Sequence, residues 1–142
     1  AKKHIEFARH YDPSIPMLLA DEEKIVQLFT NLIKNAIDAI EDSGTIKVKT
    51  SVVTDYHFLT EGKKKCKMVS VDISDTGKGI REEDIPKIFT PFFTTKPDGS
   101  GLGLTVCHKI ITDHKGSIRV RSIPGKGTTF TINIPVSEDD KK

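Results

Sequence analysis

The chain has 142 residues, 36% of them hydrophobic, and a formal net charge of +2 at pH 7, which is the size and composition of one globular domain. The near-balance of 22 basic and 20 acidic residues argues against nucleic acid as a partner, because nucleic-acid binders usually carry an excess of positive charge. No apolar run approaches the roughly 18 residues needed to cross a bilayer. The two cysteines, Cys66 and Cys107, are too far apart for a C-x-x-C metal site. We therefore expect a single cytosolic domain spanning residues 1–142.

The first third of the chain predicts a strand followed by a long helix. Apolar and polar residues alternate over 4–11, which is typical of a short strand, and two prolines within 12–16 indicate a turn. Asp21 has the position of a helix N-cap. Apolar residues then recur at intervals of three and four from Ile25 to Ile40, which predicts an amphipathic helix ending near Ser43-Gly44.

The middle of the chain predicts two strands and a short helix. Residues 45–54 and 68–74 are rich in Val, Ile and Thr and predict strands. The polar segment 55–67, with its lysine run at 63–65, is expected to be a long hairpin loop with a solvated tip. A glycine-rich turn at 75–80 then precedes a short helix at 82–89.

The last third predicts a loop, a helix and a closing hairpin. Residues 90–100 carry two prolines and several Thr and Ser residues, so we expect a mobile loop. A second helix should run from Gly101 to about His114, followed by strands at 118–122 and 128–134 and a charged tail at 137–142. This order predicts an α/β two-layer sandwich, with a mixed, mostly antiparallel sheet and helices on one face.

Asn31, Asn35 and Asp38 share the polar side of the first long helix, because residues at this spacing lie within roughly 60° of each other. Amide and carboxylate oxygens are the ligands that a hard cation such as Mg²⁺ prefers. A capping or helix-packing role is the alternative for these three side chains.

Two glycine-rich motifs follow. Asp75-x-Gly77-x-Gly79 comes directly after a strand and would let a ligand approach the backbone, although an ordinary Asp-x-Gly turn has the same pattern. Gly99-x-Gly101-x-Gly103 opens a helix, and free amides at a helix N-terminus form an anion site suited to phosphate. This second motif is not a dinucleotide fingerprint, because no strand precedes it, and it lacks the Gly-Lys-Ser/Thr of a Walker A motif.

The combination of these motifs resembles the sensor histidine kinases, and most closely their nitrogen-regulatory subgroup, over about residues 19–135. Four segments resemble the N box, the two glycine boxes and the F box, and a fifth resembles the closing hairpin of the family. In chain order they are Asn31-x-x-x-Asn35-Ala36, Asp75-x-Gly77-x-Gly79, Ile88-Phe89-x-Pro91-Phe92-Phe93, Gly99-x-Gly101-x-Gly103-Leu104 and Ser122-x-Pro124-Gly125-x-Gly127-Thr128-x-Phe130.

The resemblance implies a Bergerat-type ATP site with Mg²⁺. Asn35 would ligate the metal, Asn31 would support the metal or its waters, and Asp75 would accept a hydrogen bond from the adenine amino group. Residues 90–100 would form a lid over ATP, with Lys96 near the γ-phosphate. Asn31 and Lys96 are thus the expected catalytic residues. The expected nucleotide-binding residues are Asn35, Asp38, Asp75, Gly77, Gly79, Ile80, Thr94, Thr95, Gly101, Leu102, Gly103, Leu104 and Thr128.

One position departs from the family pattern. Many sensor kinases have Lys three residues after the metal-binding Asn, where this chain has Asp38. A carboxylate cannot pair with phosphate, so Lys34 or Lys96 would supply the positive charge.

The resemblance also implies that the same ATP-binding fold serves gyrases, mismatch-repair ATPases and chaperones, in which a Glu four residues before the metal-binding Asn is the general base for hydrolysis. Asn31 holds that position here, and an amide cannot take up a proton at neutral pH. Transfer to another group is therefore favoured, with an ATPase or a nucleotide-binding module without turnover as alternatives. None of the five histidines lies in the H-E/D-x-x-N/R-P context of an acceptor. We expect a monomeric catalytic domain that acts on a separate histidine hairpin domain, with a response regulator downstream.

Overall fold

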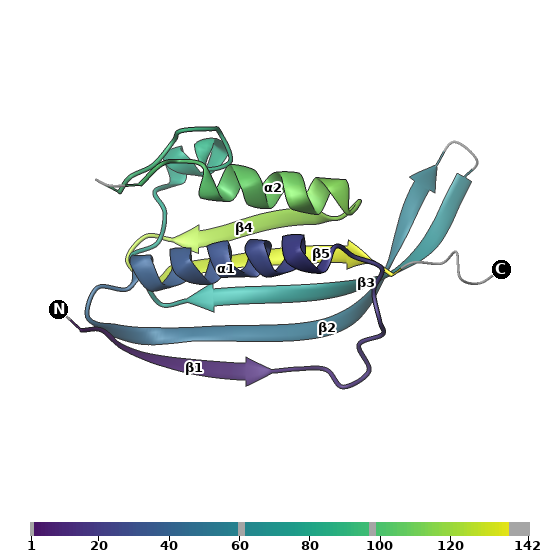
Figure 1. The fold of residues 1–142 in the computed structure, drawn as a ribbon, viewed down its shortest axis with the longest axis horizontal. Helices are drawn as coiled ribbons and strands as arrows, with labels where there is room; N and C mark the ends of the chain where they lie inside the picture. The colour runs from purple at the N-terminus through teal and green to yellow at the C-terminus, as the bar shows by residue number, and fades with distance from the viewer. Residues whose placement is uncertain (1, 60–61, 97–98, 137–142) are drawn as a thin grey trace.

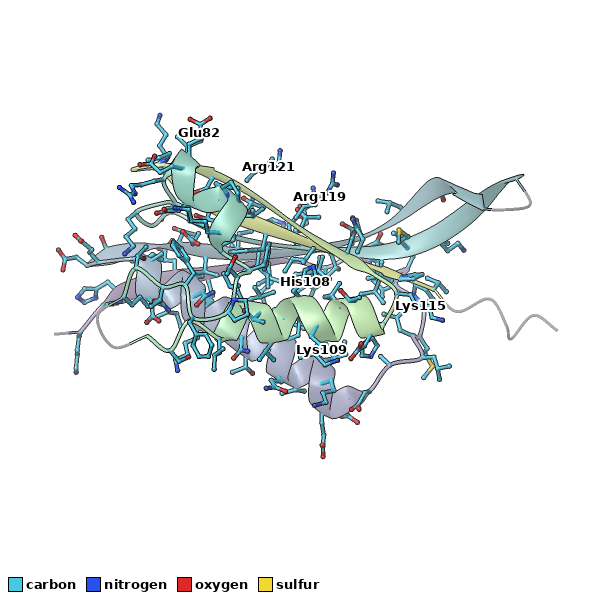
Figure 2. The ribbon with its side chains drawn as sticks, turned by 90° about the horizontal axis from the view of Figure 1, so that it is seen from above. Glu82, His108, Lys109, Lys115, Arg119 and Arg121 are labelled. Atoms are coloured by element: carbon cyan, nitrogen blue, oxygen red, sulfur yellow. The ribbon has the colours of Figure 1, made fainter. Side chains whose placement is uncertain are left out.

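The computed structural model describes residues 2–59, 62–96 and 99–136. Within them, five strands form one sheet in the order β1-β2-β3-β5-β4, in which β1 and β2 are parallel and all other pairs are antiparallel. The two α-helices lie together on one face of this sheet (Figures 1 and 2). The predicted two-layer α/β fold is thereby confirmed. The elements are β1 (His4–His10), α1 (Glu22–Ala39), β2 (Ser43–Leu59), β3 (Gly62–Asp75), the 3₁₀ helix η1 (Glu82–Lys87), α2 (Gly103–Asp113), β4 (Ser117–Ile123) and β5 (Gly127–Pro135).

The core lies between the helices and the sheet. The amphipathic α1 turns Leu28, Leu32 and Ala36 inward, and these side chains belong to one cluster with Ile73 of β3 and Ile132 of β5. Burial of each large aliphatic side chain contributes roughly 1.5–3 kcal/mol, so this interface holds the helix in place on the sheet. The C-terminal half of α1 is thereby fixed beside the end of β3.

Both ends of α1 have local causes. The Asp21 carboxylate accepts a hydrogen bond from the Lys24 amide at 3.3 Å, as expected of an N-cap. The helix ends at Ala39, earlier than the predicted Ser43-Gly44. The prediction was wrong because Ile40, which is 1% exposed, leaves the helical conformation to bury its side chain, and Ser43 already pairs with His4 of β1.

The segment predicted as a long loop at 55–67 is strand. The antiparallel ladder of β2 and β3 continues to Leu59 and Gly62, with Tyr56 opposite Lys65 and Phe58 opposite Lys63. In Figure 1 this two-stranded ribbon extends beyond the rest of the sheet. The prediction was wrong because it weighed the polar composition and missed the aromatic residues of β2, which favour strand.

The second helix begins two residues later than predicted. Gly101 has φ +77° and its carbonyl accepts the Phe92 amide at 2.8 Å, so α2 starts at Gly103. The closing hairpin of β4 and β5 agrees with the prediction, and η1 ends two residues earlier than expected. The predicted charged tail at 137–142 lies outside the described residues. None of the described helices is both long enough and apolar enough to span a membrane.

Candidate functional site

A cleft of about 1060 Å³ lies among α1, the ends of β3 and β5, η1 and the segment that leads into α2. It brings together most of the residues that the sequence singled out. Gly77 and Leu102 are exceptions: neither lines the cleft, and the Leu102 side chain is exposed. The predicted residues on its walls are Asn31, Asn35, Asp38, Asp75, Gly79, Ile80, Thr94, Thr95, Lys96, Gly101, Gly103, Leu104 and Thr128.

A buried carboxylate marks one end of the cleft. Asp75 is the last residue of β3 and only 9% exposed. One of its oxygens, Oδ1, accepts the Gly77 amide at 2.8 Å. Burial raises the pKa of Asp75 above its ordinary value, and hydrogen bonds from the Gly77 and Thr128 amides partly oppose this shift. A carboxylate can accept about four hydrogen bonds, so this group retains acceptor capacity toward the cleft.

The first glycine motif builds the wall beside this carboxylate. A Cβ on Gly77 would lie 2.5 Å from the Ala39 carbonyl oxygen, and the next residue, Lys78, donates its amide to that same oxygen at 2.9 Å. Gly79 has φ +77°, and a Cβ there would lie 2.5 Å from the Ile123 carbonyl oxygen. Both glycines are therefore required by the packing of the turn against α1 and β4.

The polar row of α1 divides into two roles. The Asn31 amide group donates to the Gly103 carbonyl at 3.4 Å, so Asn31 connects the two helices, as the helix-packing alternative anticipated. Asn35 and Asp38 instead contact the loop: the Lys96 ammonium donates to Asn35 Oδ1 at 3.2 Å and to Asp38 Oδ2 at 2.9 Å. The side-chain oxygens of Asn35 and Asp38 therefore both accept a hydrogen bond from the Lys96 ammonium.

The donor set determines which metal this end can take. Among the described residues, no group of three or more His, Cys, Asp and Glu side chains could hold a metal ion. Asn35 and Asp38 offer only oxygen ligands, and the Lys96 ammonium that contacts Asn35 Oδ1 shows that this oxygen can accept a positive charge such as a metal ion. Mg²⁺ commonly binds through one or two protein oxygens, with phosphates and water completing its shell. The residues therefore fit a Mg²⁺ ion that arrives with a phosphate chain.

The start of α2 forms the third wall. First-turn amides of a helix have no partner within the helix, and the N-cap residue here, Leu102, makes no side-chain cap hydrogen bond. A Cβ on Gly103 would meet no protein atom within 4 Å, whereas one on Gly101 would lie 2.3 Å from the Phe92 carbonyl carbon. Gly101 is thus required by the fold, while Gly103 leaves open space in the cleft. The arrangement suits an anion.

Residues 93–96, 99 and 100 line this side of the cleft. Thr94 Oγ1 accepts the Lys96 amide at 3.0 Å, and the Lys96 carbonyl accepts the Gly99 amide at 3.2 Å. Thr95 also lines the cleft. These bonds fix the backbone of Lys96 while leaving its side chain 41% exposed.

An ion pair in the cleft was missed from the sequence. Asp84 is 3% exposed, and Arg81 Nε donates to its Oδ2 at 3.1 Å. The pair raises the pKa of Arg81, chiefly through the hydrogen bond to Asp84. The spacing of three residues was the available signal, but the acidic run from Glu82 to Asp84 resembles a solvated helix start.

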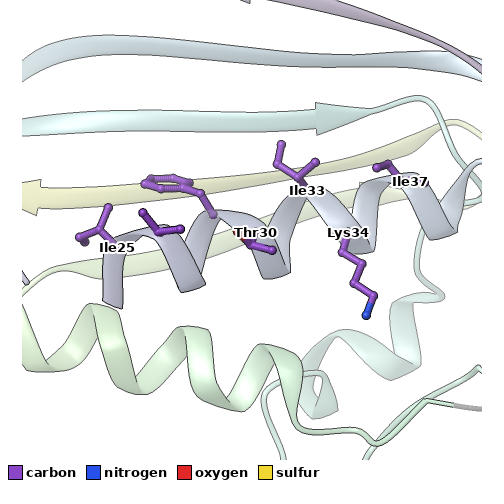
Figure 3. A pocket seen from close by; sticks show the side chains of 7 residues that line it. Ile25, Thr30, Ile33, Lys34 and Ile37 are labelled. Carbon is purple, nitrogen blue, oxygen red and sulfur yellow. The ribbon is translucent and has the colours of Figure 1, made fainter. Parts of the chain in front are cut away.

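A second hollow, of about 600 Å³, runs along another face of α1 (Figure 3). Its lining comes from one helix and is mainly aliphatic or aromatic, with Thr30 and Lys34 as its only polar residues, so it offers no carboxylate for a base and no helix start for a phosphate chain. The cleft is therefore the candidate nucleotide site. The residues of the hollow are Ile25, Val26, Phe29, Thr30, Ile33, Lys34 and Ile37.

Comparison with known proteins agrees with this geometry. Residues 20–138 match the family model described as histidine kinase-, DNA gyrase B- and HSP90-like ATPase. The chain is 40% identical over 124 residues to the sensor histidine kinase ZraS of Escherichia coli (strain K12), covering 87% of this chain and 24% of that protein. It is 38% identical over 137 residues to the sensory histidine kinase/phosphatase NtrB of Rhodobacter capsulatus, covering 94% of this chain and 38% of that one. The chain thus spans well under half of each relative.

A solved structure shows the same fold. The catalytic domain of histidine kinase ThkA superposes with a TM-score of 0.75 at 36% identity, covering 95% of this chain and 81% of that one. The match extends over most of both chains, so the two domains share their overall fold.

Proposed function

The chain belongs to the family of histidine kinase-, DNA gyrase B- and HSP90-like ATPases and is a nucleotide-binding catalytic domain of the histidine kinase type. We propose that it transfers the γ-phosphoryl group of ATP to a histidine on a separate helical hairpin domain. One observation carries this proposal. A single cleft joins the buried carboxylate of Asp75, the amide oxygen of Asn35 and the open helix start at Gly103.

Asp75 selects the base. Its carboxylate accepts hydrogen bonds but donates none when ionised, so it complements the exocyclic amine of adenine. Guanine presents a carbonyl oxygen at the corresponding position, which would face the carboxylate without a hydrogen bond. The nearby Thr128 hydroxyl, 2.8 Å from Ser122 Oγ, adds a polar group on the same wall.

The opposite end of the cleft holds the phosphates. The first-turn amides of α2 are aligned to donate to an anion, and the missing Cβ of Gly103 lets that anion approach the backbone. Asn35 would hold Mg²⁺, with Asp38 beside it. When bound, the metal neutralises the phosphate oxygens and orients the transferred group.

Asn31 favours transfer over hydrolysis. A hydrolase needs a base to take a proton from water, and an amide cannot do so at neutral pH. The Asn31 side chain is moreover engaged with the Gly103 carbonyl at 3.4 Å. The acceptor is therefore a group on another domain, because none of this chain's five histidines has an acceptor sequence context.

The remaining assignments follow from this reaction. We assign the phosphoacceptor hairpin of the same or a paired kinase as the direct partner, and a response regulator as the receiver of the phosphoryl group. Residues 90–100 act as a lid over ATP, and the domain by itself is a monomer in the cytoplasm, where ATP is supplied.

Incubation with ATP labelled at the γ-phosphate tests the proposal. We expect the chain to remain unlabelled by itself and to label an added cognate acceptor hairpin domain. Release of labelled phosphate with no labelled protein would favour the ATPase alternative. Stoichiometric labelling of any histidine of this chain would contradict the separate acceptor.

A further inference from the structure

The Lys96 ammonium contacts Asn35 Oδ1, the oxygen that the proposed function assigns as a metal ligand. The ammonium is 3.2 Å from Asn35 Oδ1 and 2.9 Å from Asp38 Oδ2. A Mg²⁺ ion held by Asn35 Oδ1 would share that oxygen with the ammonium, and the two positive charges would repel each other. Lys96 and the metal therefore compete for one oxygen.

The surrounding backbone allows Lys96 to move without opening the turn. Thr94 Oγ1 holds the Lys96 amide and the Gly99 amide holds its carbonyl, so the Lys96 Cα has a fixed position. A Cβ on Gly99 would lie 2.6 Å from Thr94 Oγ1, so Gly99 packs closely against Thr94. The ammonium alone can swing, because the side chain is 41% exposed.

Asp38 supplies the shorter contact and the opposite charge. We propose that Asp38 is a positioning residue for Lys96: in the nucleotide-free domain it holds the lid lysine over Asn35 Oδ1, and binding of Mg²⁺ with ATP displaces this ammonium toward the γ-phosphate.

This inference rests on the proposed function and predicts a competition that can be measured without catalysis. Releasing the ammonium from Asn35 should ease metal binding. An exposed ion pair contributes little, so the concentration of Mg²⁺ that gives half-maximal enhancement of ADP binding should fall by about two- to fivefold. Lys96→Met should cause this change. Asp38→Asn is tested through the Lys96 amine instead, because it also removes a carboxylate beside the metal.

The reactivity of the Lys96 amine gives a second measurement on the nucleotide-free chain. Acetylation with acetic anhydride, followed by mass spectrometry, should modify Lys96 several-fold faster in Asp38→Asn than in the original protein. Asp38→Glu keeps the carboxylate and should restore slow modification. The matched control is Asp113→Asn, which removes the partner of Lys109, an exposed pair at 3.3 Å on α2. It should leave Lys96 reactivity and the Mg²⁺ requirement unchanged.

The outcomes separate the two proposals. If the original chain does not bind ADP, the proposed function itself is overturned. Normal ADP binding with unchanged Lys96 reactivity in Asp38→Asn, or with an unchanged Mg²⁺ requirement in Lys96→Met, would overturn the positioning role alone.

Discussion

Replacing Gly103 with alanine should weaken nucleotide binding without weakening the fold. The added Cβ would meet no protein atom within 4 Å, so the substitution costs no packing. The residue begins α2 with ordinary helical φ, where Gly→Ala replacement adds about 0.4–1 kcal/mol to the free energy of unfolding. The methyl group would, however, occupy the space in which a phosphate approaches the helix amides.

The magnitude follows from the bond that is lost. A hydrogen bond to a charged group contributes about 1.5–3 kcal/mol, and each 1.4 kcal/mol is a factor of ten, so the Kd for ADP should rise by roughly 10- to 100-fold. Calorimetric titration with ADP and thermal melting measure the two quantities on the same protein. Unchanged ADP affinity, or a Tm lowered by several degrees, would refute this interpretation of Gly103.

Gly101 provides the contrasting control two residues away. It has φ +77°, and a Cβ there would lie 2.3 Å from the Phe92 carbonyl carbon. Left-handed backbone costs a residue with a Cβ about 1–2 kcal/mol before the clash is counted. Gly101→Ala should therefore lower the Tm, whereas Gly103→Ala should not.

Three further predictions concern the base, the metal and the core. ATP should bind at least about tenfold more tightly than GTP in fluorescence titrations. Adenosine affinity should fall as the pH decreases through the raised pKa of Asp75, because the bound base requires the ionised carboxylate. Asp75→Asn should remove both the base preference and the pH dependence. Asn35→Ala should abolish phosphoryl transfer and the Mg²⁺ enhancement of ADP binding while leaving adenosine affinity and Tm nearly unchanged; a parallel loss for adenosine would indicate a packing role. Leu32→Ala, at a position 1% exposed, should lower the free energy of unfolding by about 2–5 kcal/mol in urea, against less than about 1 kcal/mol for Val26→Ala at 59% exposure.

The helices and most of the sheet could be predicted because their causes are local. Regular spacing of apolar residues from Ile25 to Ile40 determines the face of α1, and the Asp21 carboxylate caps its first turn as the sequence indicated. The error at 55–67 has a different origin. The strand at 62–67 pairs along its backbone with β2, with Lys65 opposite Tyr56, and no local pattern in the lysine run reveals that partner.

The site could be predicted as a set of motifs, while its internal contacts could not. Asp38 and Lys96 are 58 residues apart in the chain, and Asn31 and Gly103 are 72 apart. Their proximity depends on how α1, α2 and the loop pack together. The glycines show the same limit, because the motif alone does not distinguish Gly101, which the fold requires, from Gly103, which leaves space for a ligand.

The charged side chains of the cleft couple the position of Lys96 to the binding of the metal. Asp84 is neutralised by Arg81 and Asp38 by Lys96, so these two cations are already engaged before a nucleotide arrives. If Lys96 turns toward a phosphate, Asp38 becomes an uncompensated carboxylate beside a polyanion, which is unfavourable at short range. A divalent cation at Asn35 restores the balance on both sides. ATP without Mg²⁺ should therefore leave Lys96 on Asp38, and its amine should react as slowly as in the nucleotide-free protein.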